Sequence, residues 1–303
     1  MRVFVTGASG WIGSAVVPEL TGAGHQVVGL ARSEASAAAL AAAGAEALPG
    51  TIDDLDVLRA GAEAADGVIH LAFKHDLAFS GDFQGAADAD RRAVETFAET
   101  LQGSDRPFVI AGGTLGVAPG RLLTEEDRPD SPSHMGGGPA TRMGTAELTL
   151  ALAADGVRSS VLRLPPTVHG KGDHGFVASL IGVAHEKGVS GYIGDGANRW
   201  PAVHRLDAAT LFRLALESAE AGSALNAVAD EGVPVREIAE VIGRKLELPV
   251  VSVSPEEAPA HFTWLAGFLG LDSPASSVLT RTWLGWQPTQ IGLIEDLERN
   301  YFD

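Results

Sequence analysis

Three glycines follow the first apolar segment at a spacing that suits the binding of phosphate groups. Gly7, Gly10 and Gly13 form a G-x-x-G-x-x-G pattern at the point where an apolar strand gives way to a helix. Gly7 permits a tight turn, Gly10 lets a pyrophosphate approach the backbone, and Gly13 allows close packing of the helix on the strand. The helix N-terminus adds free N–H groups and partial positive charge. We therefore expect dinucleotide binding here, the alternative being a purely structural turn.

The end of the second predicted strand indicates which dinucleotide is preferred. An acidic side chain at this place would bind the 2′-hydroxyl of a ribose, but the chain has Ala31, Arg32 and Ser33 there. A guanidinium and a hydroxyl suit a 2′-phosphate, so we predict that NADP is preferred over NAD. In the alternative interpretation, Arg32 is solvated and Ser33 only caps the next helix.

These residues need a sheet to position them, and strand and helix signals alternate along the first half of the chain. Strands are expected at 3–6, 26–30, 46–48, 67–72, 107–111 and 160–164, and helices at 11–20, 33–43, 54–64, 87–101 and 141–154. Such alternation predicts an α/β fold with a parallel sheet covered on both faces. The fold class is therefore a Rossmann-type doubly wound parallel sheet, followed by a smaller C-terminal substrate domain.

The alternation loosens after Pro165, and this change sets the expected domain boundaries. Helices are expected at 207–219 and 235–246, and strands at 225–229 and 250–253. We assign residues 1–165 to a dinucleotide-binding domain, to which residues 205–230 return. Residues 166–204 and 231–303 form the expected substrate-binding domain.

Composition excludes several classes of protein. With 22 basic and 39 acidic residues the net charge is −17, which makes nucleic acid and anionic membranes poor partners. The absence of cysteine excludes disulfides, thiolate metal sites and a cysteine nucleophile. No apolar run reaches the roughly 18 residues of a membrane span, so a cytoplasmic location is expected.

Several ordered motifs resemble one known family. The segments VTGASGWIG, GTIDDLDVL and GVIHLAF, followed by VLRLPPTVHG and LGWQP, resemble the extended short-chain dehydrogenase/reductases, the NAD(P)-dependent epimerase/dehydratase type. The resemblance runs nearly from end to end. It implies a nicotinamide cofactor, a small-molecule substrate and a homodimer, because the helices at 87–101 and 141–154 pair two subunits in many relatives.

The resemblance also implies site residues. By position it assigns these further residues to the cofactor: Ser9, Trp11, Ile12, Ile52, Asp53, Leu71, Ala72, Phe73, Lys74, Pro165 and Thr167. Among them, Ile52 and Asp53 correspond to the adenine end, and Lys74 to a ribose or phosphate contact. Thr114 matches the catalytic hydroxyl of the family.

The chain departs from the family at the proton donor. That donor is a tyrosine four residues before a lysine, at the start of the helix expected at 141–154. The two tyrosines are Tyr192 and Tyr301, and no lysine occurs between Lys74 and Lys171, so no register recovers the pair. The lysine lowers the phenol pKa and the phenol moves the proton, so an enzyme of this sequence must use another group.

Other side chains are candidates for substrate contact or proton transfer. They are His134 in the irregular stretch 119–138, His169 and His174 in VHGKGDHG, and Arg142, Tyr192 and Trp200. Histidine titrates near neutrality and can act as a general acid. The alternatives are solvated loops for the histidines and strand packing for Tyr192 and Trp200. No metal is expected, because the glycine-rich loop would not fix ligands and offers no third one.

These observations predict an atypical NAD(P)-dependent oxidoreductase, epimerase or dehydratase that acts on a small carbonyl or hydroxyl compound. A non-catalytic NADP(H)-binding redox sensor or regulatory protein is the alternative, which the missing tyrosine–lysine pair favours. A purely structural subunit is a third interpretation, and it predicts no affinity for nucleotides.

Overall fold

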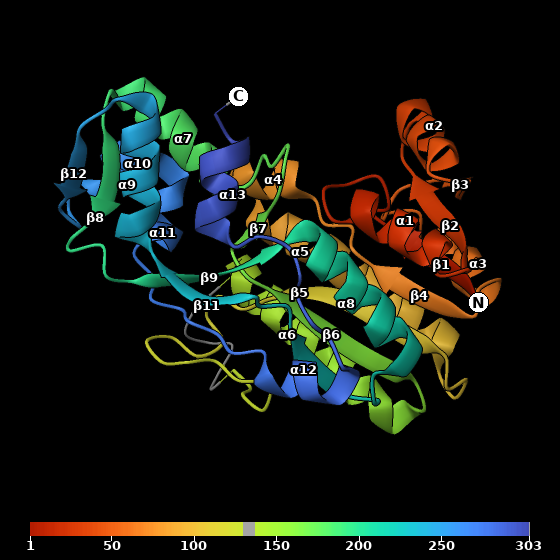
Figure 1. Ribbon diagram of the computed structural model, residues 1–303. Coiled ribbons are helices and arrows are strands. Elements are labelled where there is room, and N and C mark those ends of the chain that lie inside the picture. Colours follow the sequence, from red (N-terminus) through yellow and green to blue (C-terminus); the bar gives the residue numbers. More distant parts are fainter. Residues whose placement is uncertain (130–136, 303) are drawn as a thin grey trace.

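A seven-stranded parallel sheet forms the centre of the computed structural model, which describes residues 1–129 and 137–302 (Figure 1). Within these ranges its strands are β1 (Arg2–Thr6), β2 (Gln26–Ala31), β3 (Glu46–Pro49), β4 (Gly67–His70), β5 (Pro107–Gly113), β6 (Arg158–Leu164) and β10 (Ser223–Asn226). Their order is β10-β6-β5-β4-β1-β2-β3. The predicted doubly wound parallel sheet is confirmed.

The strand order reverses beside β1, and this reversal sets the place of the site. Phe4 pairs with Val28 of β2 on one side and with Val68 of β4 on the other. The chain therefore leaves β1 in one direction along the sheet and later continues in the other. In open parallel sheets, ligands bind beyond the carboxyl ends of the strands at such a switch point.

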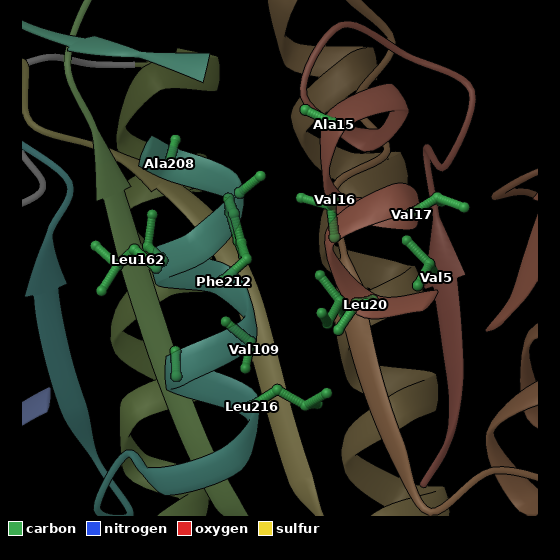
Figure 2. Close-up of a cluster of buried hydrophobic side chains, with 14 of the residues drawn as sticks. Val5, Ala15, Val16, Val17, Leu20, Val109, Leu162, Ala208, Phe212 and Leu216 are labelled. Atoms are coloured by element: carbon green, nitrogen blue, oxygen red, sulfur yellow. The ribbon is translucent and has the colours of Figure 1, made fainter. Parts of the chain in front are cut away.

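Helices cover both faces of the sheet because each strand is apolar on both sides. On one face lie α1 (Gly13–Gly22), α2 (Glu34–Ala42) and α8 (Arg205–Ser218). Figure 2 shows Phe212 and Leu216 of α8, Val16 and Leu20 of α1, and the strand residue Val109 in this core. The opposite face is covered by α3 (Leu55–Glu63), α5 (Phe83–Leu101) and α6 (Gly137–Ala151), which the short helix η2 (Leu152–Asp155) continues.

A smaller part with its own apolar core stands beyond the end of the large sheet (Figure 1). It contains a three-stranded sheet of order β11-β9-β7 and a two-stranded sheet of β12 and β8. Its strands are β7 (Thr167–His169), β8 (Ser190–Ile193), β9 (Arg199–His204), β11 (Asp230–Pro234) and β12 (Val250–Val253). Its helices are α7 (Phe176–Lys187), α9 (Val235–Leu246), α10 (Ala258–Phe262), η3 (Thr263–Leu265), α11 (Ala266–Leu269) and α13 (Leu293–Asn300).

Two further short helices complete the described chain. The first, α4 (His75–Phe79), follows β4, and the second, α12 (Val278–Leu284), packs beside α8 and β10. The return of the chain through α8 and β10 to the large sheet agrees in position with the expected segment 205–230, while the domain boundaries themselves stay a prediction. Of the helices in the described ranges, none combines the length and apolar character needed to cross a membrane.

Candidate functional site

The glycine-rich turn joins β1 to α1, and its geometry explains the glycines. Gly7 has a φ of +65°, and a Cβ there would lie 2.7 Å from the backbone nitrogen of Ala72 on the neighbouring strand end. At Gly13 a Cβ would lie 2.1 Å from the carbonyl oxygen of Gly7. No side chain caps the N-terminus of α1 at Ile12; the N–H groups of Ser14 and Ala15 donate to backbone carbonyls, so the N–H of Gly13 is the one in this first turn that faces no protein acceptor among the described residues and suits an anion.

A cavity of about 1140 Å³ opens in front of this turn, at the carboxyl ends of the large sheet. It brings together most of the residues that the sequence assigned to the cofactor. These are Gly7, Ser9, Gly10, Trp11, Ile12, Gly13, Arg32, Ile52, Asp53, Leu71, Ala72, Phe73, Lys74 and Pro165. Their convergence from separate loops is what a doubly wound sheet produces when its strands end on one side.

Two residues assigned to the cofactor lie outside the lining of the cavity. Ser33 is the N-cap of α2, where its hydroxyl accepts a hydrogen bond from the backbone nitrogen of Ser36 at 3.2 Å. Thr167 is buried in β7, and its hydroxyl donates to the carbonyl oxygen of Pro201 at 2.6 Å. Both side chains are thus engaged with the protein, and Ser36 is the hydroxyl that lines the cavity beside Arg32.

An ion pair stands at the nucleotide end of the cavity. Lys74 Nζ lies 2.6 Å from Asp53 Oδ2, and a guanidinium nitrogen of Arg92 lies 3.8 Å from the other carboxylate oxygen. Two cations therefore share one carboxylate. The two positive charges exceed the single negative charge of this carboxylate, and the excess suits phosphate groups.

A buried polar chain fixes the strand ends beneath the turn. Thr6 Oγ1 lies 2.7 Å from His70 Nδ1, and His70 Nε2 lies 3.2 Å from Asp90 Oδ1 on α5. The Thr6 hydroxyl also accepts from the backbone nitrogen of Ala72, which directs its own proton to Nδ1 and leaves Nε2–H to donate to Asp90. Burial raises the pKa of Asp90, but the hydrogen bond from His70 and the charge of Arg142 outweigh it and lower the pKa. The carboxylate is therefore held ionised.

Thr114 sits at the end of β5 with an unused hydroxyl. Its side chain is buried and lines the cavity, while its backbone nitrogen donates to Leu164 at 2.9 Å. The Oγ1 atom has no hydrogen-bond partner among the described residues. A buried hydroxyl without a partner is costly, so this one is free to bind a ligand oxygen.

The other candidates for substrate contact divide into two groups. Arg142 and His174 line the cavity, and the ring of His174 packs edge-on against Trp11 with centroids 5.5 Å apart. His169, Tyr192 and Trp200 do not line it. His134 lies outside the described residues.

Each of the three residues away from the cavity has a partner in the smaller part. His169 is fully buried, and its Nδ1 lies 2.8 Å from Asp296 Oδ2. Tyr192 lies under the guanidinium of Arg236, and Trp200 is buried in the core beside Phe176. Strand packing, the alternative interpretation for Tyr192 and Trp200, describes their surroundings.

Helix α6 presents side chains other than a tyrosine and a lysine to the cavity. The lining residues from this helix are Pro139, Arg142, Met143, Ala146 and Glu147. Among the described residues no tyrosine lines the cavity. Arg142 projects its guanidinium carbon to 3.8 Å from the centre of the Phe73 ring and donates to the carbonyl oxygen of Ala111 at 3.4 Å.

His75 also lines the cavity, although it was not among the residues predicted from the sequence. Loss of water around its ring and the positive charge of Arg142 lower the pKa of His75 to about 4. The imidazole is therefore neutral at neutral pH and cannot supply a proton from a cationic form. His75 follows a strand end with no motif around it, so no local signal marked it.

The described residues contain no group of three or more His, Cys, Asp or Glu side chains that could hold a metal ion. The site is thus built from a glycine-rich turn, a helix N-terminus, a few cations and one unpaired hydroxyl.

A doubly wound α/β sheet whose glycine-rich turn opens on a cavity at the switch point defines the class of nucleotide-binding α/β proteins. The sequence profile of the NAD dependent epimerase/dehydratase family matches residues 3–228. The chain belongs to this family.

Known proteins agree with this assignment. The chain is 52% identical over 298 residues, 98% of each chain, to an uncharacterized protein of Schizosaccharomyces pombe. It is 28% identical over 188 residues, 62% of this chain and 56% of the other, to a 4-hydroxy-2-methyl-3-oxo-4-farnesyl-3,4-dihydroquinoline-1-oxide ketoreductase of Stigmatella aurantiaca. In structure it is similar to MoeE5 in complex with UDP-glucuronic acid and NAD, with a TM-score of 0.77, 24% identity and coverage of 99% and 98% of the two chains. That likeness shows the fold.

Proposed function

We propose that this chain is an NADP-preferring oxidoreductase that acts on a small carbonyl or hydroxyl compound. The observation that carries the proposal is the single cavity that the glycine-rich turn shares with the unpartnered hydroxyl of Thr114. The turn suits a pyrophosphate, and the hydroxyl suits the oxygen of a substrate. The ketoreductase of Stigmatella aurantiaca, a relative named for such a reaction, supports the class of reaction.

The residues present fit a nicotinamide dinucleotide. The glycine backbone and the uncapped N-terminus of α1 would hold the pyrophosphate, and Asp53 with Ile52 would border the adenine. The bound group would supply hydride transfer at the nicotinamide. Thr114 would hold the reacting oxygen of the substrate by a hydrogen bond.

NADP preference rests on the end of β2. Arg32 lines the cavity and forms no ion pair within 4.0 Å among the described residues, while Ser36 supplies a hydroxyl beside it. Ala31, Arg32 and Ser33 occupy the strand end where an acidic side chain would bind a 2′-hydroxyl. MoeE5, with NAD bound, is a neighbour at 24% identity and bears on the fold only.

His174 is our candidate for the proton donor. Of the candidate histidines that lie within the described residues, His174 lines the cavity and His169 does not. The loop that carries His174 follows β7 directly. Thr114 cannot titrate in this role, because an aliphatic hydroxyl has far too high a pKa. His174 would therefore deliver or remove the proton while Thr114 positions the oxygen.

Cofactor binding is the first test of the proposal. Gly10→Val adds a branched side chain at the turn, where even a Cβ would lie 3.1 Å from the carbonyl oxygen of Gly7. Titration with NADPH, followed by its fluorescence, should show tight binding by the wild type and loss of at least tenfold in Gly10→Val. Gly22→Val, at the far end of the helix that follows the turn, is the control, because no heavy atom lies within 4 Å of its added Cβ. Wild-type affinity in a folded Gly10→Val protein would refute the site.

Cofactor preference is tested separately. Arg32→Ala should narrow the difference in binding free energy between NADPH and NADH by roughly 1–3 kcal/mol, the size of a lost charge-assisted hydrogen bond. Equal affinities of the wild type for the two cofactors would contradict the preference.

A non-catalytic NADP(H) sensor is the second candidate. The observation that favours it is the lining of α6, which holds Arg142 and Glu147 but neither a tyrosine nor a lysine. The two functions differ in turnover, so NADPH oxidation with a panel of carbonyl compounds separates them. Binding of NADPH without oxidation in any of the mixtures would favour the sensor.

We further propose a homodimer formed by α5 and α6. The two helices pack against each other on one face of the large sheet. Light scattering at micromolar concentration should give twice the mass of one chain. The mass of a single chain would contradict the dimer.

A further inference from the structure

Aromatic side chains gather where the cavity meets the smaller part of the molecule. We call this group the aromatic wall: Phe73, Phe79, Phe83, Phe176, Trp264 and Phe268, all of which line the cavity. Phe73 and Phe79 come from the segment between β4 and α5, Phe83 begins α5, and the last three come from α7, η3 and α11. Residues far apart in the sequence thus build one apolar surface.

Ring contacts link the two halves of the aromatic wall. The rings of Phe79 and Trp264 lie with centroids 4.7 Å apart at an angle of 30°. Phe176 contacts Trp264 at 5.4 Å and Phe268 at 5.5 Å, and Phe73 contacts Phe83 at 5.7 Å. Contacts at these distances are favourable and hold the rings in defined orientations. The wall is therefore a preformed surface that continues across both sides of the cavity.

The wall leaves large apolar surfaces uncovered. Phe79 is 44% exposed and Trp264 is 38% exposed, although both are large aromatic residues. Exposed aromatic surface grouped at a cavity costs free energy in water and marks a binding surface. A flat apolar ligand would recover this cost by stacking on the rings.

One fixed charge stands beside the wall. The Arg142 guanidinium stacks on Phe73 and makes one long hydrogen bond, to Ala111, with no carboxylate within 4.0 Å among the described residues. The carboxylate of Asp173, which also lines the cavity, accepts from the Tyr301 hydroxyl at 2.7 Å and from the backbone nitrogen of Gly175. Arg142 therefore retains donors for an acidic oxygen of a ligand.

A nucleotide diphosphate fits this end of the cavity poorly. The other guanidinium in the lining on this side of the sheet, Arg163, donates to the carbonyl oxygens of Thr124 and Asp127 at 3.3 and 2.7 Å. Besides Asp53, three acidic side chains line the cavity, namely Asp76, Glu147 and Asp173. One available cation among these carboxylates suits a single negative charge and not the two or more of a diphosphate.

We propose that the aromatic wall and Arg142 select a planar, conjugated carbonyl compound that carries one acidic oxygen. The rings of the wall stack on the flat ligand, and Arg142 binds the acidic oxygen by charge-assisted hydrogen bonds. The proposal names the substrate class of the oxidoreductase proposed above and rests on that function.

Calorimetry with two probes tests the substrate class. 2-Naphthoate is flat and carries one carboxylate, whereas UDP carries the diphosphate that the structure disfavours. The wild type should bind naphthoate, and UDP should not displace it. Trp264→Leu should weaken naphthoate binding about tenfold, and Arg142→Met should weaken it about 10- to 100-fold. Arg142→Lys keeps the charge and should bind within a few-fold of the wild type.

The control is Trp283→Leu, which replaces a half-exposed tryptophan on α12 outside the cavity lining. It should leave naphthoate affinity unchanged. Circular dichroism confirms that each variant is folded, and Phe79→Leu repeats the Trp264 test from the other side of the wall. Naphthoate binding that is equal in the wild type and Arg142→Met, or UDP binding tighter than naphthoate, would overturn the proposal.

A parallel NADPH titration separates this proposal from the proposed function. A protein that binds NADPH but not naphthoate contradicts the substrate class and leaves the oxidoreductase in place. A protein that binds naphthoate through Arg142 but no dinucleotide contradicts the oxidoreductase and supports the assignment of the wall. Failure of both ligands contradicts both proposals.

Discussion

A buried polar atom without a hydrogen-bond partner lowers the stability of the folded chain, so its presence calls for an explanation. Thr114 Oγ1 is such an atom. Thr167 is its counterpart, equally buried, but its hydroxyl donates to the carbonyl oxygen of Pro201. Thr114 follows β5 and Thr167 begins β7, and both side chains are almost fully buried, so their difference is not one of burial. It reflects what each hydroxyl has to bind.

Replacement by valine should therefore change stability with opposite signs at the two positions. Thr114→Val removes an unsatisfied hydroxyl and should raise the free energy of unfolding by about 1 kcal/mol, whereas Thr167→Val should lower it by about 1 kcal/mol. Urea unfolding followed by circular dichroism measures both. Thr114→Val should also lower turnover roughly 10²-fold, as for loss of a positioned donor. A stability loss at both positions would mean that the Thr114 hydroxyl has a partner.

The site residues that could be predicted from the sequence are those carried by local motifs. Gly7, Gly10 and Gly13 fall in one turn, and their spacing alone states their role. The aromatic wall has no such signal, because Phe79 and Trp264 meet only after distant parts of the chain have folded together. Trp264 is 38% exposed and lines the cavity, a position that its neighbours in the sequence do not indicate.

At the scale of elements, a helix must approach the sheet closely enough to bury its apolar face. Gly61 makes this approach possible for α3, because a Cβ at this position would lie 2.7 Å from the buried ring of Phe4 on β1. A Cβ added at Gly182 in α7 would have no heavy atom within 4 Å, so the missing side chain there serves no contact. The same residue type thus has a packing role in one helix and none in the other.

Alanine at the two glycines should separate packing from helix propensity. Gly182→Ala should raise the free energy of unfolding by about 0.5–1 kcal/mol, the usual gain of alanine over glycine inside a helix. In Gly61→Ala the same gain is opposed by overpacking that costs about 1–3 kcal/mol, so the net effect is a loss of roughly 1 kcal/mol. Chemical unfolding of both variants provides the measurement. Equal gains in both would show that α3 can move away from β1 freely.

Helices and strands were predicted correctly where the hydrophobic periodicity and the residues that begin or end an element indicate the same bounds. The expected helix at 235–246 and the strand at 250–253 have the observed bounds of α9 and β12. Helix α7 was missed, since Phe176–Lys187 follows a glycine-rich loop and is apolar on most sides. Asp207 lies in the first turn of α8 but does not cap it, because His204 is the N-cap. The Asp207 carboxylate instead accepts from the backbone nitrogens of Thr289 and Gln290, a long-range contact that no local pattern reveals.

For the molecule as a whole, the last helix and the residues after it hold in place a strand and a loop next to the cavity. α13 packs against β7, β9 and α9, and Asp296 on it bonds to His169 of β7 with both side chains fully buried. Tyr301, just after the helix, donates to Asp173 in the loop that lines the cavity. The C-terminal end of the chain lies beside this region in Figure 1. The final segment therefore supports a loop that lies far earlier in the sequence.

The contact between Asp296 and His169 should make the free energy of unfolding depend on pH in a defined direction. Burial raises the pKa of Asp296, but hydrogen bonds from His169 and Asn300 outweigh it and hold the pKa below its usual value. A carboxylate with a lowered pKa in the folded state stabilises the fold fully above its unfolded value, near pH 4, and loses this contribution as pH falls through the folded pKa. Asp296→Asn keeps the shape of the side chain and removes the charge. At pH 7 it should lower the free energy of unfolding by about 2 kcal/mol, since hydrogen bonds to a charged group are lost.

The test is a series of urea titrations of the wild type and Asp296→Asn between pH 7 and pH 3. The difference in unfolding free energy should stay constant down to about pH 4 and then shrink, because protonation removes the same charge from the wild type. Asp56→Asn is the control, as this carboxylate is fully exposed and pairs only with Arg59 on the surface of α3. It should match the wild type at pH 7. A difference for Asp296→Asn that grows toward low pH would mean that the buried pair is stabilised by protonation, and that α13 is held by apolar packing instead of by the His169–Asp296 bond.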